Sequence, residues 1–374
     1  MGQHESGGGS ASDSTISTLA RESSATSVSR RRSTLRDVAR LAGVSLKTAS
    51  NVINGTGRMT QSTRNKVEAV IKQTGYRVNI SARNLNRDRT GVLMLAVPSL
   101  TPPYLAELAN RTIDAARERG YSVYVTTYAE GSAKGAKDIL HSYNSTVADG
   151  MILSMSEVVN ITADDLEVDF PLVVVGARST WGKADHVTPN DVQAGAAATG
   201  YLFDRGSCSL AVVGAREDLD ENKLLQATEG NAELRLRGII EECLRRRKRL
   251  DPRLVGNTGK DWTIGAGARA AQRILDSGIG LDGVVALNDQ LAIGVLSVLS
   301  ANGVNAPGQV QVIGFDNIEE SAYLQIPLTS MDSRLDWTAP TAVDRILGRI
   351  RGDIVNPELL MTDSFVVPRG STRA

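Results

Sequence analysis

The sequence predicts an all-α helix-turn-helix domain followed by a larger α/β domain with two lobes. Three observations predict it. Three short amphipathic patterns follow one another after residue 33. From residue 90 onward, short apolar runs alternate with amphipathic helical patterns. This alternation occurs in two blocks, and continuous apolar strands between helices are typical of parallel sheets covered on both faces.

The composition is that of an ordinary globular protein. The chain has 374 residues, of which 41% are hydrophobic and 22% charged, so more than one domain is expected. It contains no long apolar run and no basic-then-apolar leader, which indicates a cytoplasmic protein without a membrane partner. Cys208 and Cys243 lie far apart, which indicates reduced thiols rather than a disulfide or a zinc site.

Charge is distributed unevenly although the formal net charge is zero. The stretch from Arg30 to Arg89 holds fourteen Lys or Arg residues and three Asp or Glu residues. A basic unit attached to an acidic body favours one domain for nucleic acid and another for a different partner. From charge alone, a solvated basic surface with no partner remains an alternative.

The helices of the basic unit are predicted from their caps. Residues 1–32 are rich in Ser, Gly and Thr and are expected to be a disordered leader. Thr34 with Asp37 resembles a capping box, and Gly43 ends the first helix. Ser45 begins the second helix as N-cap. Thr60 opens a third helix, and a stop is expected at residue 75.

The α/β region is predicted as an ordered series of strands and helices. The strands are expected at 92–97, 122–127, 150–153, 172–175, 210–213, 283–286 and 310–313, and the helices at 105–119, 134–145, 234–246, 264–276 and 292–302. Ligands of such domains bind at the carboxyl ends of the strands, in the crevice between the lobes.

The second helix of the basic unit is the predicted base reader, because a helix-turn-helix inserts the start of its second helix into the major groove. That start is Leu46, Lys47 and Thr48. Lys47 can donate to guanine, Asn51 one turn later can pair with adenine, and Leu46 suits a thymine methyl group. The side chains expected at phosphates are Thr34, Ser45, Ser50, Arg58 and Arg64. Capping alone is the alternative role of Ser45 and Thr48.

Residues 35–45 (LRDVARLAGVS) and 48–55 (TASNVING) resemble the DNA-binding domain of the lactose-repressor (LacI/GalR) family. The resemblance continues through Thr63-Arg64 and Gly75-Tyr76 into residues 82–85. It implies a hinge near residues 81–87 that becomes helical on DNA. Leu85 would then insert into the minor groove above Ala82, an apolar wedge of the kind that kinks a duplex. A plain linker is the alternative. Asn51 stands where many members carry Arg, so the base preference is expected to differ.

The larger domain resembles the family's effector domain, which is similar to periplasmic sugar-binding proteins. The resemblance is carried by residues 103–108, 149–153, 288–294, 312–317 and 327–330. It implies effector contacts at Tyr104, Arg235, Trp262 and Asp289. The alternatives are a surface ion pair for Arg235, a core position for Trp262 and helix capping by Asp289, alone or together with ligand binding.

The resemblance also sets the expected domains. They are a leader at 1–32, the helix-turn-helix domain at 33–78, a hinge at 79–90, a first lobe of 91–190 with 316–331, and a second lobe of 191–315 with 332–374. The implied function is an effector-controlled transcriptional regulator, most simply a repressor. Its partners would be palindromic double-stranded operator DNA, a small effector of carbohydrate type and a second copy of the chain.

Other classes have less support. The segment at Gly265 does not follow a strand directly and is a poor dinucleotide loop, and His4, His141 and His186 lack nucleophile or metal spacing. We therefore expect no enzyme, no cofactor and no metal. A sugar-binding protein without a DNA role is the alternative function, but it leaves the basic helices unexplained. The basic run 245–249 is interpreted as a solvated helix end rather than a second nucleic-acid surface.

Overall fold

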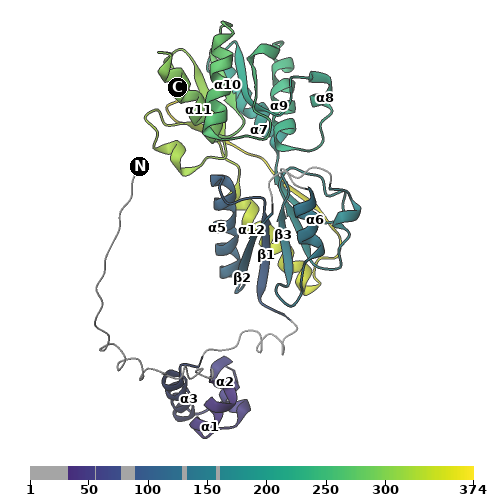
Figure 1. Ribbon diagram of the computed structural model, residues 1–374, viewed down its shortest axis with the longest axis vertical. Coiled ribbons are helices and arrows are strands. Elements are labelled where there is room, and N and C mark those ends of the chain that lie inside the picture. The colour runs from purple at the N-terminus through teal and green to yellow at the C-terminus, as the bar shows by residue number, and fades with distance from the viewer. Residues whose placement is uncertain (1–32, 55, 77–88, 129–132, 157–160) are drawn as a thin grey trace, which may run out of the picture. The chain divides into compact units, whose positions relative to one another are not determined.

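The computed structural model describes residues 33–54, 56–76, 89–128, 133–156 and 161–374 (Figure 1). The chain divides into two compact units, residues 1–83 and 84–374. Each unit is described by itself. Among the described residues, no helix has the length and apolar character needed to cross a membrane.

The first unit is the predicted helix-turn-helix domain. It consists of α1 (Leu35–Ala42), α2 (Leu46–Asn54) and α3 (Gln61–Thr74). Thr34 and Asp37 form the predicted capping box, and Gly43 ends α1 in the left-handed region at φ 65°, where glycine is favoured because it has no Cβ. The three helices bury a small apolar core made of Val38, Val52, Val67 and Val70.

Two six-stranded sheets form the second unit. The first has the order β11-β5-β4-β3-β1-β2 and is parallel throughout. The second has the order β12-β10-β9-β8-β6-β7 and is parallel except for β12. The strands are β1 (Val92–Val97), β2 (Ser122–Thr127), β3 (Gly150–Ser154), β4 (Leu172–Val175), β5 (Asp185–Pro189), β6 (Leu210–Ala215), β7 (Val255–Asn257), β8 (Gly283–Ala286), β9 (Gln311–Phe315), β10 (Thr329–Met331), β11 (Leu359–Thr362) and β12 (Val366–Val367).

Helices cover both sheets, and the predicted fold class is confirmed. On the first sheet, α5 and α12 pack over one apolar core, and α6 contributes Ala136 and Leu140 to another. Figure 1 shows α5 and α12 beside each other against this sheet. The helices are α5 (Pro103–Glu118), α6 (Ala133–His141), α7 (Asp191–Asp204), α8 (Glu221–Leu225), α9 (Asn231–Arg245), α10 (Ile264–Asp276), α11 (Asp289–Ala301) and α12 (Leu335–Arg351), with short 3₁₀ turns η1 (Asp164–Leu166), η2 (Pro252–Leu254) and η3 (Glu319–Ala322).

The expected exchange of segments between the lobes is wrong. We placed 316–331 in the first lobe, but β10 pairs with β9 in the second sheet, with Thr329 opposite Ile313. We placed 332–374 in the second lobe, but β11 pairs with β5, with Leu359 opposite His186. The buried side of α12, including Val343 and Ile346, completes the core of the first sheet. The chain therefore passes between lobes three times, at residues 190, 332–334 and 363–365.

Close packing of α7 and α9 brings together two parts of the candidate effector site. A Cβ on Gly238 of α9 would lie 1.9 Å from the carbonyl oxygen of Val192, and one on Gly195 of α7 would lie 2.1 Å from that of Arg235. Neither position accommodates a larger residue without moving a helix. The two glycines thus hold Asp191 at the start of α7 next to Arg235 on α9.

Candidate DNA-binding surface and effector site

The start of α2 presents the predicted base-reading side chains to solvent. Leu46 is 45% exposed, and Lys47 is exposed beside it. The other side of the helix is anchored by Ala49 and Val52, which are buried. An exposed leucine next to a lysine, on a helix fixed from behind, is suited to contact base edges in a major groove.

Several predicted phosphate contacts also cap helices. The backbone N–H of Thr48 donates to the hydroxyl of Ser45 at 3.0 Å, and the two hydroxyl oxygens lie 2.8 Å apart. Thr34 donates to Asp37 at 2.7 Å. Ser45 therefore caps α2, and the Thr48 side chain contacts this cap through the Ser45 hydroxyl. A helix N-terminus also attracts phosphate, so capping and DNA contact are compatible.

Asn51 lies against the loop that follows α2. A Cβ on Gly57 would lie 2.8 Å from the side-chain nitrogen of Asn51, and Gly57 has φ 82°. The half-buried Asn51 therefore depends on glycine at this turn. Ser50 and Arg64 are half-buried, and Arg58 is exposed. The hinge residues Ala82 and Leu85 lie outside the described residues, as does the leader 1–32.

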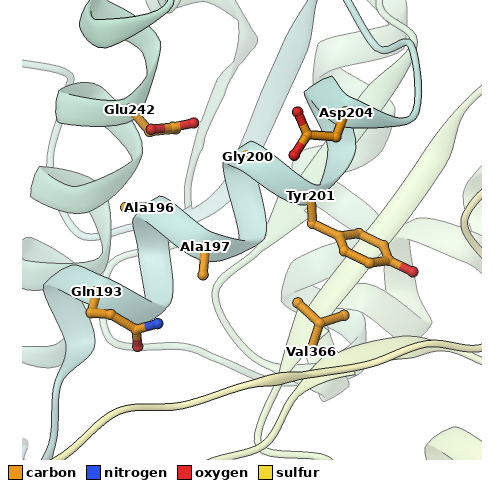
Figure 2. Close-up of a pocket in the computed structure, with 8 residues that line it drawn as sticks. All are labelled: Gln193, Ala196, Ala197, Gly200, Tyr201, Asp204, Glu242 and Val366. Carbon is orange, nitrogen blue, oxygen red and sulfur yellow. The ribbon is translucent and has the colours of Figure 1, made fainter.

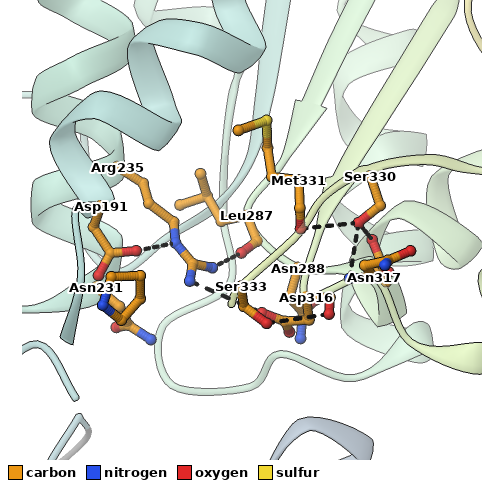
Figure 3. A network of polar contacts seen from close by, with 12 residues as sticks. Asp191, Asn231, Arg235, Leu287, Asn288, Asp316, Asn317, Ser330, Met331 and Ser333 are labelled. Carbon is orange, nitrogen blue, oxygen red and sulfur yellow. Dashed lines mark hydrogen bonds and ion pairs between the residues drawn. The ribbon is translucent and has the colours of Figure 1, made fainter. Parts of the chain in front are cut away.

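The candidate effector site centres on Arg235, which is 6% exposed (Figure 3). Its Nε donates to Asp191 Oδ1 at 2.7 Å, and its Nη1 donates to the carbonyl oxygen of Leu287 at 2.5 Å. Its Nη2 lies 3.9 Å from Asp316 Oδ1. The alternative of a surface ion pair is wrong, because the guanidinium is buried among groups that follow β5, β8 and β9.

Asp316 is a site residue that the sequence analysis did not single out. It follows β9 directly and has φ 96°, and Asn317 after it has φ 53°. Burial raises the pKa of its carboxyl to about 6 against the opposing effect of Arg235. Its position at the carboxyl end of a buried strand was the signal that could have identified it.

Tyr104 is the first-lobe residue predicted to contact the effector. Burial raises the pKa of its phenol, and the charges of Asp316 and Asp191 raise it further, so the ring lies within electrostatic range of both carboxylates. Its position at the start of α5, after β1, places it at the carboxyl end of the first sheet. Its role as an effector contact, which the resemblance implies, stays a prediction.

Trp262 adds an aromatic face. It is half-buried, its Nε1 donates to the carbonyl oxygen of Gly214 at 3.0 Å, and its ring packs partly on the core of the second sheet. The Arg235 guanidinium carbon lies 5.9 Å from the ring centroid. Asn288, also missed by the sequence analysis, donates to the backbone carbonyl oxygen of Trp262 at 3.1 Å and so holds the backbone that carries the indole.

Asp289 contacts other parts of the second lobe, and its role as an effector contact stays a prediction. Its side chain is fully buried. One carboxylate oxygen accepts from Ser330, and the other accepts from Ser321 and from the backbone of Ile318, at 2.7 to 3.0 Å. The capping alternative is wrong, because Asn288 is the N-cap of α11. Asp289 holds the segments around β10 and η3 in place.

A hollow of about 400 Å³ lies on the outer face of α7 and is a different surface (Figure 2). Its two acidic groups already pair with Arg246, at 2.6 Å from both Asp204 and Glu242. It includes none of the predicted effector contacts. Its lining is Gln193, Ala196, Ala197, Gly200, Tyr201, Asp204, Glu242 and Val366.

Two further predictions concern charged side chains. In the basic run 245–249, Arg245 and Arg246 pair with Glu242, and Arg249 lies 3.4 Å from Glu221. This pairing is typical of the solvated helix end that we expected. Among the residues that the structure describes, no three metal-ligating side chains come together.

Comparison with known proteins identifies both units. Residues 34–79 match the profile of bacterial regulatory proteins of the lacI family, and residues 199–372 match that of a periplasmic binding protein-like domain. The ribose operon repressor of Escherichia coli (strain K12) is 28% identical over 340 residues, which cover 90% of this chain and 99% of that protein.

Solved structures of similar proteins are also LacI-type regulators. A LacI-type transcription regulator from Bifidobacterium animalis subsp. lactis is 32% identical, with a TM-score of 0.71, and the match covers 76% of this chain and 100% of that one. The lac repressor dimer bound to operator and the anti-inducer ONPF, at 22% identity and a TM-score of 0.78, shares the fold over 92% of this chain and 100% of that one.

The fold, the exposed reading helix and the buried polar site define a DNA-binding regulator with a small-molecule sensor domain. The chain belongs to the LacI family of transcriptional repressors. Its α1–α3 are the family's DNA-binding domain, and its second unit is the effector-binding domain. The relatives are transcriptional repressors rather than enzymes. A sugar-binding protein without a DNA role is therefore excluded as the alternative.

Proposed function

We propose that the chain acts as a cytoplasmic homodimer that represses transcription from a palindromic operator, with Lys47, Leu46 and Asn51 reading bases. Two copies present two reading helices, and a palindrome matches their two-fold symmetry. Residues 33–78 would be the reader, and residues 79–90 would be the hinge that carries Leu85 and Ala82. The phosphate contacts would be Thr34, Ser45, Ser50, Arg58 and Arg64, and Thr48 would lie with Leu46 and Lys47 at the start of the reading helix.

The effector is proposed to be a neutral carbohydrate bound between the lobes by Tyr104, Arg235, Trp262 and Asp316. The observation that carries this proposal is the convergence of Arg235 with Asp191 and Asp316. Carboxylates accept hydrogen bonds from hydroxyl groups, the guanidinium donates to ring or hydroxyl oxygens, and the indole stacks on an apolar sugar face. Two carboxylates against one guanidinium disfavour an anionic ligand. The name of the ribose operon repressor supports the same ligand class.

Calorimetric titration of the full chain with D-ribose, other neutral monosaccharides and ribose 5-phosphate tests the ligand class. We expect a neutral sugar to bind at least about tenfold more tightly than its phosphorylated form, because the phosphate would be buried beside Asp316 and Asp191. Asp316→Asn should weaken that binding by a similar factor, and Arg253→Gln, remote on η2, should leave it unchanged. Tighter binding of the phosphate would contradict the proposal.

Selection from a pool of random duplexes, followed by anisotropy titration, tests the reader. Lys47→Ala should weaken binding to the selected duplex by about ten- to a hundredfold and relax the preference at one base pair, as expected for a base contact. Lys72→Ala, in the last turn of α3, is the matched control. Equal losses on selected and scrambled duplexes would show that Lys47 contacts only phosphate.

A further inference from the structure

The loop that follows β4 in the first lobe contacts the loop between α8 and α9 in the second lobe. Arg178 lies just after β4 in the first lobe, and Glu229 lies just before α9 in the second. Arg178 Nη1 is 3.4 Å from Glu229 Oε1, and the backbone N–H of Ser179 donates to Glu229 Oε2 at 3.1 Å. The backbone N–H of Gly230 donates to the carbonyl oxygen of Ala177 at 2.8 Å.

These contacts form one unit, which we call the rim latch: residues 177–179 with 229–230. Arg178 is held on its own lobe, since its Nε donates to the carbonyl oxygen of Ser156 at 3.3 Å. The Arg178 side chain is 15% exposed and that of Glu229 is 37% exposed. Gly230 has φ 89°, and a Cβ there would lie 2.1 Å from Glu233 Oε2. The backbone conformation at the start of α9, from which the Gly230 amide reaches Ala177, therefore favours glycine.

The latch acts on the same helix that carries the effector contacts. Gly230 is the N-cap of α9, and Arg235 lies on the second turn of that helix. Asn231 between them accepts from Arg216 at 3.1 Å. Because a helix moves as a rigid element, fixing its first turn against the first lobe also fixes the distance from Arg235 to Tyr104.

We propose that the Arg178–Glu229 latch holds the two lobes together beside the candidate effector site, and so makes Arg178 and Glu229 positioning residues for the effector response. The link to the effector response rests on the proposed function, since holding the lobes together favours any effector that binds both of them. The latch itself can be measured without adding an effector.

Hydrogen exchange of the Gly230 amide in the full chain is the direct test. Its hydrogen bond crosses between lobes, so exchange reports opening of the latch even when the open population is small. Arg178→Gln should speed exchange at Gly230 by about two- to fivefold, the effect of losing a partly exposed ion pair. This variant leaves the chemical neighbours of the Gly230 amide unchanged. Raising the salt concentration should speed exchange in the parent chain and much less in the variant.

The controls separate latch opening from general loosening. The Thr258 amide donates to the carbonyl oxygen of Ala215 at 2.8 Å within the second lobe, and its exchange should stay unchanged. Arg253→Gln, which breaks an ion pair with Asp251 inside the second lobe, should change neither amide. Unchanged exchange at Gly230 in Arg178→Gln, or equal acceleration at Gly230 and Thr258, would overturn the proposal. A sugar panel without any binder would refute the proposed effector class and leave these rates as they are.

Discussion

Individual residues show how the effector site is stabilised before any ligand arrives. Arg235 uses Nε and Nη1 on the protein itself and points Nη2 toward Asp316. Burial raises the pKa of Asp191, while the neighbouring Arg235 lowers it. The two charges therefore depend on each other, since a buried carboxylate without its cation is strongly unfavourable.

Replacing Arg235 by Leu should destabilise the chain by about 3–5 kcal/mol, because it leaves Asp191 buried without a partner. Urea denaturation followed by circular dichroism measures this change. Arg237→Leu on the same helix breaks a half-exposed pair with Glu241 and should cost at most about 1 kcal/mol. Equal losses in the two variants would show that burial of the Asp191–Arg235 pair is unimportant.

Asp289 should make stability depend on pH in an unusual direction. Burial, followed by the charge of Asp316, raises its pKa from 3.8 to about 7. The folded chain therefore binds a proton that the unfolded chain releases between about pH 4 and 7, so stability falls as the pH rises through this window. Asp289→Asn should reduce the slope of the urea midpoint against pH between about pH 4 and 7. Asp114→Asn, on the exposed side of α5, should not. An unchanged slope in Asp289→Asn would contradict the raised pKa.

At the residue level, local rules predicted the helix caps, such as the capping box of Thr34 and Asp37. The effector contacts Arg235, Tyr104 and Trp262 came from the family resemblance. The sequence could not assign the N-cap of α11, because Asn288 and Asp289 are both plausible at a helix start. Only the contacts of Asp289 with Ser321 and Ser330, far along the chain, assign it a structural role.

At the scale of elements, helix pairs in the second lobe pack backbone against backbone. Gly267 of α10 and Gly294 of α11 repeat the arrangement seen between α7 and α9. A Cβ on Gly267 would lie 2.4 Å from the carbonyl oxygen of Leu291, and one on Gly294 would lie 2.2 Å from that of Ile264. These positions set the distance between helices and thereby the depth of the site.

Gly238→Ala should destabilise the chain by about 1–3 kcal/mol, because the added methyl group forces α7 and α9 apart. Gly265→Ala, near the start of α10, should instead stabilise it by about 0.5–1 kcal/mol, because its nearest neighbour is the flexible end of Arg269. Thermal unfolding of both variants measures the two signs. If both substitutions stabilised the chain, α7 and α9 would be able to move apart without loss of stability.

Most elements of the chain were predictable, and their partners were not. The capping rules located α1–α3, and apolar runs located strands such as β1, β4 and β8. The elements missed include β5, β7 and the last helix and strands. α12 contains Pro340 and has an amphipathic pattern that fits either sheet. The position of α12 depends on which sheet still has an exposed apolar face, and this face exists only once the first lobe has folded.

At the scale of the whole molecule, the two units differ in charge, since the first is basic and the second is acidic. The basic reader should give operator binding a strong salt dependence, because each phosphate contact releases counterions. Arg58→Gln should make the negative slope of log K against log salt concentration shallower by about 1. It should weaken binding to all duplexes by a similar factor. Anisotropy titrations at several salt concentrations measure it, with Arg111→Gln in the second unit as the control. A loss confined to one duplex sequence would make Arg58 a base contact instead.

The late return of α12 and β11 to the first sheet has a consequence for synthesis. A nascent chain that has emerged to residue 331 contains every strand of the second sheet except β12, yet its first sheet still lacks α12 and the edge strand β11. The apolar surface that includes Ile152 and Val173 then lacks the part of its cover that α12 supplies. The first lobe is thus completed only near the end of translation, and a stop codon shortly before α12 would damage a lobe whose first strand is encoded more than two hundred codons earlier.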